Sequence, residues 1–243
     1  MLPGQAAGRS LAILQLQPGY DSWRRFLPAT WIGAGDFFGV AHGRGTEMKR
    51  TEANVLSRIQ LAPLSEMTPE QKQVHDEAAQ GRRGHAPAPI IAWLKTPEFA
   101  RRAQKLGEFL RYETSLPPRL SELAILITAR FWTAHYEWRV HKQEALKAGV
   151  NPDVVAAIAS RRRPEFPTDK EAVVYEIATS LFSSGLVPEA VYRQGVAVLG
   201  EKAVVELVGL LGYYTLVSFT LNAFEINLPE AIEPELLAAD FRR

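Results

Sequence analysis

From Thr68 onward, apolar residues recur at the three- and four-residue spacing of helices that bury one face. Such sets are Phe99, Ala103, Leu106 and Leu110, then Leu123, Leu126 and Ile127, and later Val174, Ile177, Ala178 and Leu181. The alternating pattern typical of half-buried strands is nearly absent from the sequence. The pattern therefore predicts an all-α fold.

Capping and turn residues divide this helical region into segments. Helix starts are predicted at Thr68-Pro-Glu-Gln71, which matches a capping box with proline at the first helical position, and likewise at Thr96-Pro97 and Thr168-Asp-Lys-Glu171. Helix ends or turns are predicted at Pro117-Pro118, Ala148-Gly149, Phe166-Pro167, Gly185 to Pro188 and Leu228-Pro229. These boundaries predict a bundle of about eight helices.

The domain organisation changes near Met48. Residues 48–243 are expected to form a single helical domain. Residues 1–47 carry scattered glycines, prolines and aromatic residues without a sustained helical or strand period. We interpret them as an irregular N-terminal arm, or equally as the product of a translation start assigned too far upstream of Met48.

Composition and charge narrow the functional classes. The chain is 47% hydrophobic and 23% charged, which is ordinary for a globular protein with a real core. Its formal net charge of +1 creates no global field toward nucleic acid or an anionic membrane, so neither partner is predicted. The absence of cysteine excludes disulfides, thiolate metal sites and a redox-active thiol.

Two apolar stretches bear on localisation. Leu11 to Leu16 is too short for the core of a secretion signal, so a cytoplasmic protein is expected. Leu207 to Phe224 is uncharged and about long enough for a membrane helix. Because Gly209, Gly212 and several polar residues interrupt it, we interpret it as a buried helix of an oligomeric helical protein.

The segment from Leu116 to Gly149 is dense in ionisable and aromatic residues. Glu137 and His141 lie four residues apart and share one helix face. Arg130 would join that face if the helix is unbroken. Glu122 would then lie roughly 22 Å from Glu137 on a straight helix. A break near Phe131 to Thr133 would instead let Glu122 fold back towards His141, at the expense of Arg130; both alternatives remain open.

The spacing of these residues resembles a known family pattern. Glu122, eleven residues, Ala134, two residues, Glu137, three residues and His141 are similar to the Glu, Cys, Cys and His frame of alkyl hydroperoxidase D-like proteins, with Ala134 and Glu137 at the cysteine positions. The Tyr136-Glu137-Trp138 and His141 signature resembles the cysteine-free branch of that carboxymuconolactone decarboxylase-like superfamily. The likeness spans roughly residues 55 to 230.

This resemblance implies a fold, an assembly and a reaction. The fold is the alkyl hydroperoxidase D-like helical bundle, assembled as a homo-oligomer, either a trimer or a hexamer. The implied activity is that of 4-carboxymuconolactone decarboxylase, a lyase acting on a small carboxylated lactone, and not that of a thiol peroxidase. Loss of CO2 from such a lactone leaves electrons that spread onto the lactone oxygen, so no cofactor is needed as an electron sink.

Site residues follow from the same resemblance. The catalytic set is Glu137, His141 and Glu122, which would transfer a proton or orient its donor. The substrate-binding set is Arg130, Arg139, Tyr136 and Trp138, with the arginines available to clamp a carboxylate.

Several alternatives remain at the level of sequence. The same site could catalyse isomerisation, cyclisation or hydrolysis. A non-catalytic oligomeric binding protein would leave Glu137 and His141 on open surface with no cavity beside them. No metal is predicted, because His135 and His141 project about 120° apart around a helix.

Other polar residues receive structural interpretations. His75 and His85 are expected to be exposed to solvent. Tyr213 and Tyr214 are expected in the core, or at most as secondary pocket residues. The basic triplet Arg161 to Arg163 is interpreted as a solvated cap at a helix end.

Overall fold

A computed structural model describes residues 57–82, 84–228 and 232–236. The predicted arm of residues 1–47 and the boundary near Met48 lie outside this part of the chain. The described residues form helices only: α1 (Pro69–Gln80), α2 (Ile90–Trp93), α3 (Pro97–Tyr112), α4 (Pro118–Phe131), α5 (His135–Lys147), α6 (Pro152–Ala159), α7 (Asp169–Ser184), α8 (Glu189–Leu199) and α9 (Glu201–Ala223). The all-α prediction is confirmed: the described residues form nine helices, against a prediction of about eight, and α2 is a single turn.

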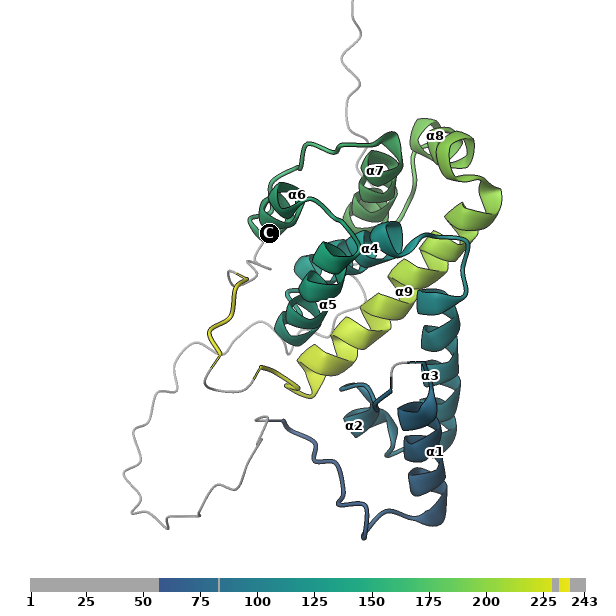
Figure 1. Ribbon diagram of the computed structural model, residues 1–243, viewed down its shortest axis with the longest axis vertical. Helices are drawn as coiled ribbons and strands as arrows, with labels where there is room; N and C mark the ends of the chain where they lie inside the picture. The colour runs from purple at the N-terminus through teal and green to yellow at the C-terminus, as the bar shows by residue number, and fades with distance from the viewer. Residues whose placement is uncertain (1–56, 83, 229–231, 237–243) are drawn as a thin grey trace, which may run out of the picture. The chain divides into compact units, whose positions relative to one another are not determined.

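Helix α4 lies at the centre of the bundle. It packs against α5, α7 and α9, which surround it in Figure 1. Every residue from Leu120 to Arg130 is buried, including the charged side chains of Glu122 and Arg130. Because a buried charge without a partner is costly, these two residues must find partners on neighbouring elements.

Local sequence sets most helix boundaries. The Thr68 hydroxyl accepts a hydrogen bond from the Gln71 amide, and the Gln71 side chain accepts one from the Thr68 amide, so the predicted capping box is present. Thr168 caps α7 through the Glu171 amide. Thr96 makes no side-chain capping bond, and its helix begins with Pro97 instead.

Small residues bring α3 close to α9. The buried face of α3 includes Ala100, Ala103 and Gly107, whereas Phe99 and Leu106 are exposed. A methyl group added at Gly107 would overlap the phenol of Tyr213 on α9. The close approach therefore requires glycine at this position and fixes where Tyr213 lies.

Helix α9 is the predicted apolar helix. It is long and apolar enough to cross a membrane by length and composition, and 56% of its most apolar 18-residue window is buried in the protein. The core helices of many globular proteins meet the same criterion, so one such helix is weak evidence for a membrane span. Val205, Val208 and Phe219 form an exposed apolar face on α9.

The chain bends sharply between α4 and α5. Thr133 adopts a left-handed conformation with φ of 51°, and the Ala134 amide donates to the carbonyl of Ala129. A β-branched residue in this conformation costs about 1 to 3 kcal/mol. The Thr133 hydroxyl accepts hydrogen bonds from Arg130 and Arg161, which help to hold it there. Of the two alternatives left open by the sequence, the broken helix is the one observed.

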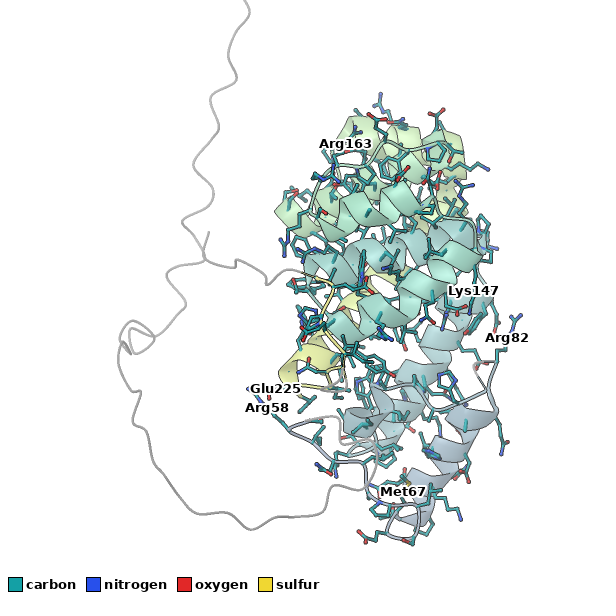
Figure 2. All side chains as sticks on the ribbon, turned by 60° about the vertical axis from the view of Figure 1, so that its left-hand side comes forward. Arg58, Met67, Arg82, Lys147, Arg163 and Glu225 are labelled. Atoms are coloured by element: carbon teal, nitrogen blue, oxygen red, sulfur yellow. The ribbon has the colours of Figure 1, made fainter. Side chains whose placement is uncertain are left out.

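The segment before α1 is tied to the end of α9. The Arg58 amide donates to the carbonyl of Phe224, and the Arg58 guanidinium forms an ion pair with Glu225 (Figure 2). Both charged side chains are largely exposed, so this pair contributes little to stability.

Candidate functional site

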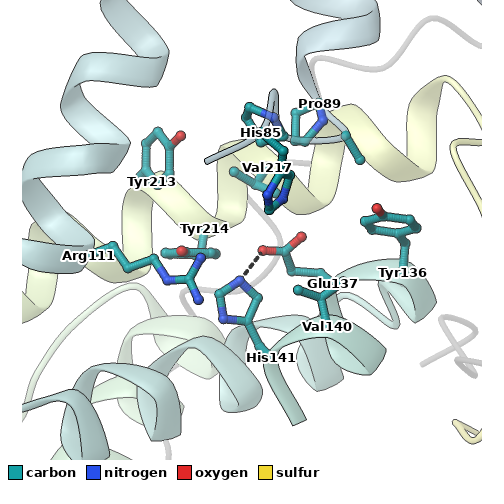
Figure 3. A pocket seen from close by; sticks show the side chains of 12 residues that line it. His85, Pro89, Arg111, Tyr136, Glu137, Val140, His141, Tyr213, Tyr214 and Val217 are labelled. Atoms are coloured by element: carbon teal, nitrogen blue, oxygen red, sulfur yellow. Dashed lines mark ion pairs between the residues drawn. The ribbon is translucent and has the colours of Figure 1, made fainter. Parts of the chain in front are cut away.

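Four charged side chains from three helices form a continuous chain of contacts. His141 on α5 contacts a carboxylate through each ring nitrogen: Nδ1 lies 2.5 Å from Oε2 of Glu122 and Nε2 lies 2.9 Å from Oε1 of Glu137. Arg111 on α3 donates from Nε to the other oxygen of Glu122, at 3.2 Å. Figure 3 shows Arg111, His141 and Glu137 converging from two sides.

The bend at Thr133 makes this arrangement possible. It reverses the chain so that Glu122 on α4 and His141 on α5 face each other across the packed pair of helices. The contact between Glu137 and His141 needs only the helical spacing of four residues within α5.

Burial and neighbouring charges together set the ionisation of His141 and Glu122. His141 is only 3% exposed. Burial alone would lower its pKa, but the charges of Glu122 and Glu137 and the hydrogen bonds to them raise the pKa of His141 to about 9. Burial would raise the pKa of Glu122, yet the positive charges of His141 and Arg111 hold that pKa below its ordinary value. His141 is therefore an imidazolium at neutral pH, with both N–H groups donated to carboxylates.

A small open cavity of about 60 Å³ lies beside this chain. Its walls come from α3, α5, α9 and the segment between α1 and α2 (Figure 3). The charged residues that reach it are Arg111, Glu137 and His141, and its aromatic walls are Tyr136, Tyr213 and Tyr214. A cavity needs only about 10 to 15 Å³ of such volume to hold one water molecule, so this cavity admits several waters or part of a small molecule.

Aromatic packing orients the imidazole. Tyr214 meets the ring of His141 edge-on, with centroids 5.1 Å apart and the planes at 84°. Tyr213 in turn meets Tyr214 edge-on at 5.4 Å. With two carboxylates and an aromatic ring around it, the imidazole has little freedom to rotate.

The structure brings together four of the seven residues predicted for the site. Glu137, His141 and Tyr136 line the cavity, and Glu122 lies behind His141. Both predicted catalytic carboxylates thus contact His141, one at each ring nitrogen.

Three residues predicted to contact the substrate lie outside this cavity. Arg130 points away from the cavity and donates to the carbonyl of Ala159, because the bend at Thr133 rotates α4 relative to α5. Trp138 is in the core, where its indole N–H donates to Glu235. Arg139 is half-buried and does not line the cavity.

Sequence reasoning missed the arginine that does line the cavity. Arg111 lies 26 residues before Glu137, outside the motif, and the apolar spacing of α3 carries no signal for it. Tyr213 and Tyr214, which the sequence predicts in the core or at most as secondary pocket residues, are buried and line the cavity. His85 is exposed, as predicted, yet it also lines the cavity.

The described residues contain no group of three His, Cys, Asp or Glu side chains arranged to hold a metal ion. The site is instead a pair of carboxylates around an imidazolium, with a guanidinium at one end. Such an arrangement can store a proton, transfer it to a bound molecule and attract a carboxylate to Arg111.

Comparisons with known proteins agree with the fold. Residues 97–179, from the start of α3 into α7, match the model of the Carboxymuconolactone decarboxylase family. A structure of a protein of unknown function from Agrobacterium tumefaciens, an AhpD antioxidant-defence candidate, superposes with a TM-score of 0.52 at 14% identity, covering 58% of this chain and 97% of that one.

A second structure is the alkylhydroperoxidase AhpD core of an uncharacterized peroxidase-related protein from Ralstonia eutropha. It superposes with a TM-score of 0.55 at 13% identity and covers 74% of this chain and 95% of that one. No curated protein matches the chain. The family match over residues 97–179 and the helical fold shared with both structures agree with the resemblance seen in the motif around Glu137.

Proposed function

We propose that this protein is a cofactor-independent lyase that removes CO2 from a small carboxylated lactone. The observation that carries the proposal is the buried chain of Arg111, Glu122, His141 and Glu137 beside a cavity. A non-catalytic binding protein would have left Glu137 and His141 exposed and without a cavity. Their burial favours chemistry over that alternative.

The reaction needs a proton donor and a group that attracts a carboxylate. When the bond between carbon and the leaving carboxylate breaks, its electron pair spreads through the alkene onto the lactone carbonyl oxygen. A proton must then be added to carbon as CO2 departs, which replaces the carboxylate with hydrogen. His141, protonated at neutral pH, holds that proton.

The geometry assigns different roles to the two carboxylates. Glu137 lines the cavity and accepts from Nε2 of His141, so it is the group able to pass a proton from the imidazolium to the substrate. Glu122 contacts Nδ1 on the far side and keeps the imidazole charged and oriented. Glu122 is therefore a positioning residue rather than a contact to the substrate.

Arg111 supplies the positive charge for a substrate carboxylate. Its Nε donates to Glu122, and a guanidinium carries further N–H donors on its two terminal nitrogens. Because Arg111 also lines the cavity, these donors can engage a carboxylate that enters it. The site as drawn in Figure 3 thus has a cation at one end and a proton relay at the other.

The name of the Ralstonia eutropha neighbour refers to a peroxidase-related protein. We do not extend that activity to this chain, because the positions equivalent to the cysteines in the predicted frame are Ala134 and Glu137, and the chain has no cysteine. Without a thiol, the disulfide chemistry of a peroxidase of that kind has no nucleophile.

A CO2-release assay on γ-carboxylated unsaturated lactones tests the proposal. The wild-type protein is expected to release CO2, and Glu137→Gln is expected to lose about 10² to 10⁴ in kcat because it cannot relay a proton. Glu144→Gln is the matched control, since Glu144 lies on the same helix and pairs with Lys147 at the surface. No release above background by the wild-type protein, or equal turnover in Glu137→Gln, would refute the proposal.

A further inference from the structure

A second cavity lies where the end of α4, the end of α6 and the side of α7 meet. Its volume is about 170 Å³, and none of its lining residues belongs to the first cavity. Its lining includes Arg130, Arg161 and Arg162 and contains no acidic residue.

The buried arginine of this cavity has only neutral partners. Arg130 is 4% exposed. Its Nε donates to the carbonyl of Ala159 at 2.7 Å, and its Nη1 donates to the hydroxyl of Thr133 at 3.1 Å. Burial, and then the positive charge of Arg161, lower the pKa of Arg130. A buried guanidinium without a counter-ion is unfavourable, so the position favours an anion nearby.

The two other arginines also lack an acidic partner. Arg161 donates from Nη2 to the same Thr133 hydroxyl at 3.2 Å, which brings two guanidinium groups to one oxygen. Within residues 57–82, 84–228 and 232–236, no carboxylate forms an ion pair with Arg130, Arg161 or Arg162. The next residue, Arg163, does pair with Glu176, at 2.6 Å.

This arrangement refines the interpretation of the basic triplet as a solvated helix cap. Arg161 and Arg162 are exposed and follow the end of α6, as expected for a cap. They also line the cavity, whereas Arg163 does not. The triplet is therefore divided between a cavity and a surface ion pair.

The cavity is also lined by apolar and aromatic side chains. Phe131 and Phe182 stack with centroids 4.9 Å apart and planes 23° apart, and Ile127 and Ile158 line the cavity with them. An apolar cavity of about 150 Å³ engineered in another protein admits benzene. A cavity of about 170 Å³ therefore has room for one aromatic ring.

We propose that this second cavity binds a monocyclic aromatic carboxylate, with the ring against Phe131 and Phe182 and the carboxylate on Arg130, Arg161 and Arg162. The carboxylate supplies the missing counter-charge, and guanidinium groups bind it in fork geometry. The ring removes apolar surface from water. The proposal does not depend on the reaction assigned to the first cavity.

Calorimetric titration of the full chain with benzoate at neutral pH tests this site. Benzamide serves as the neutral probe of similar shape, and we expect it to bind at least about tenfold more weakly than benzoate. Arg161→Gln and Arg162→Gln each remove an exposed arginine and leave the buried Arg130 in place. Each variant is expected to weaken benzoate binding about tenfold. Arg163→Gln is the matched control, because it removes the same charge from the adjacent position outside the cavity.

Arg111→Gln separates the two cavities, because it removes the guanidinium of the first cavity and leaves the lining of the second unchanged. Benzoate binding that survives in Arg111→Gln and weakens in Arg161→Gln supports the second site. Benzoate that does not bind, that binds no better than benzamide, or that is weakened by Arg111→Gln and not by Arg161→Gln or Arg162→Gln overturns it. Failure of the CO2-release assay leaves this result unaffected.

Discussion

The ionisation of His141 predicts a specific dependence of stability on pH. The pKa of His141 rises from 6.5 in a free side chain to about 9 in the folded protein. The unfolded chain therefore loses this proton near neutral pH, while the folded protein keeps it. Above the unfolded pKa the folded state binds more protons, so the free energy of unfolding falls as pH rises.

The shift from 6.5 to about 9 sets the magnitude of the effect. It corresponds to a stabilisation of about 3 kcal/mol, because one pKa unit equals about 1.4 kcal/mol. This stabilisation is fully present below the unfolded pKa and is lost as pH rises through the folded pKa. His141 is almost completely buried, so solvent screening reduces the figure little.

Urea unfolding of the wild-type protein and of His141→Gln at a series of pH values from 6 to 10 measures this effect. The difference in unfolding free energy between the two proteins should shrink by about 3 kcal/mol across that range, whereas other titrating groups cancel in the comparison. His75→Gln is the control, since His75 contacts Asp76 on α1 and lies outside the cavity.

Parallel stability curves for wild type and His141→Gln would refute the electrostatic argument. If His141→Gln does not fold, NMR titration of the His141 ring protons in the wild-type protein gives the same information. A midpoint near that of a free histidine would mean that Glu122 and Glu137 do not hold the imidazolium.

Two further predictions concern packing and assembly. Gly107→Ala would force Tyr213 out of its position and is expected to destabilise the protein by about 1 to 3 kcal/mol. Gly212→Ala, with no neighbouring atom near the added methyl group, is expected to be neutral or slightly stabilising in thermal unfolding. Equal melting temperatures for the two variants would contradict this prediction. We also propose that the exposed apolar face of α9 forms a contact between subunits of a homo-oligomer. Val208→Glu should then lower the mass measured by light scattering, whereas Leu186→Glu, in an exposed turn, should leave it unchanged. A monomeric wild-type protein would rule this contact out.

Local sequence was sufficient for most helices and for one contact of the site. The Thr68 capping box and the Thr168 cap place two helix starts, and Gly185 ends α7 in the left-handed conformation that glycine adopts at no steric cost. The pair of Glu137 and His141 follows from a spacing of four residues within one helix. These features depend on residues close together in the sequence, so they can be predicted from one sequence alone.

The rest of the site depends on how the helices pack. The left-handed conformation of Thr133 is stabilised partly by Arg161, which lies 28 residues later in the sequence. The residues next to Thr133 therefore do not by themselves determine the bend. Because of that bend, Glu122 contacts His141, and Arg130 lines a different cavity. Arg111 reaches Glu122 only because α3 packs on the bundle through small residues such as Gly107. Contacts between distant segments arise from packing of the whole core, so sequence spacing identified the acid and imidazole of the site, and the folded bundle determined which arginine joined them.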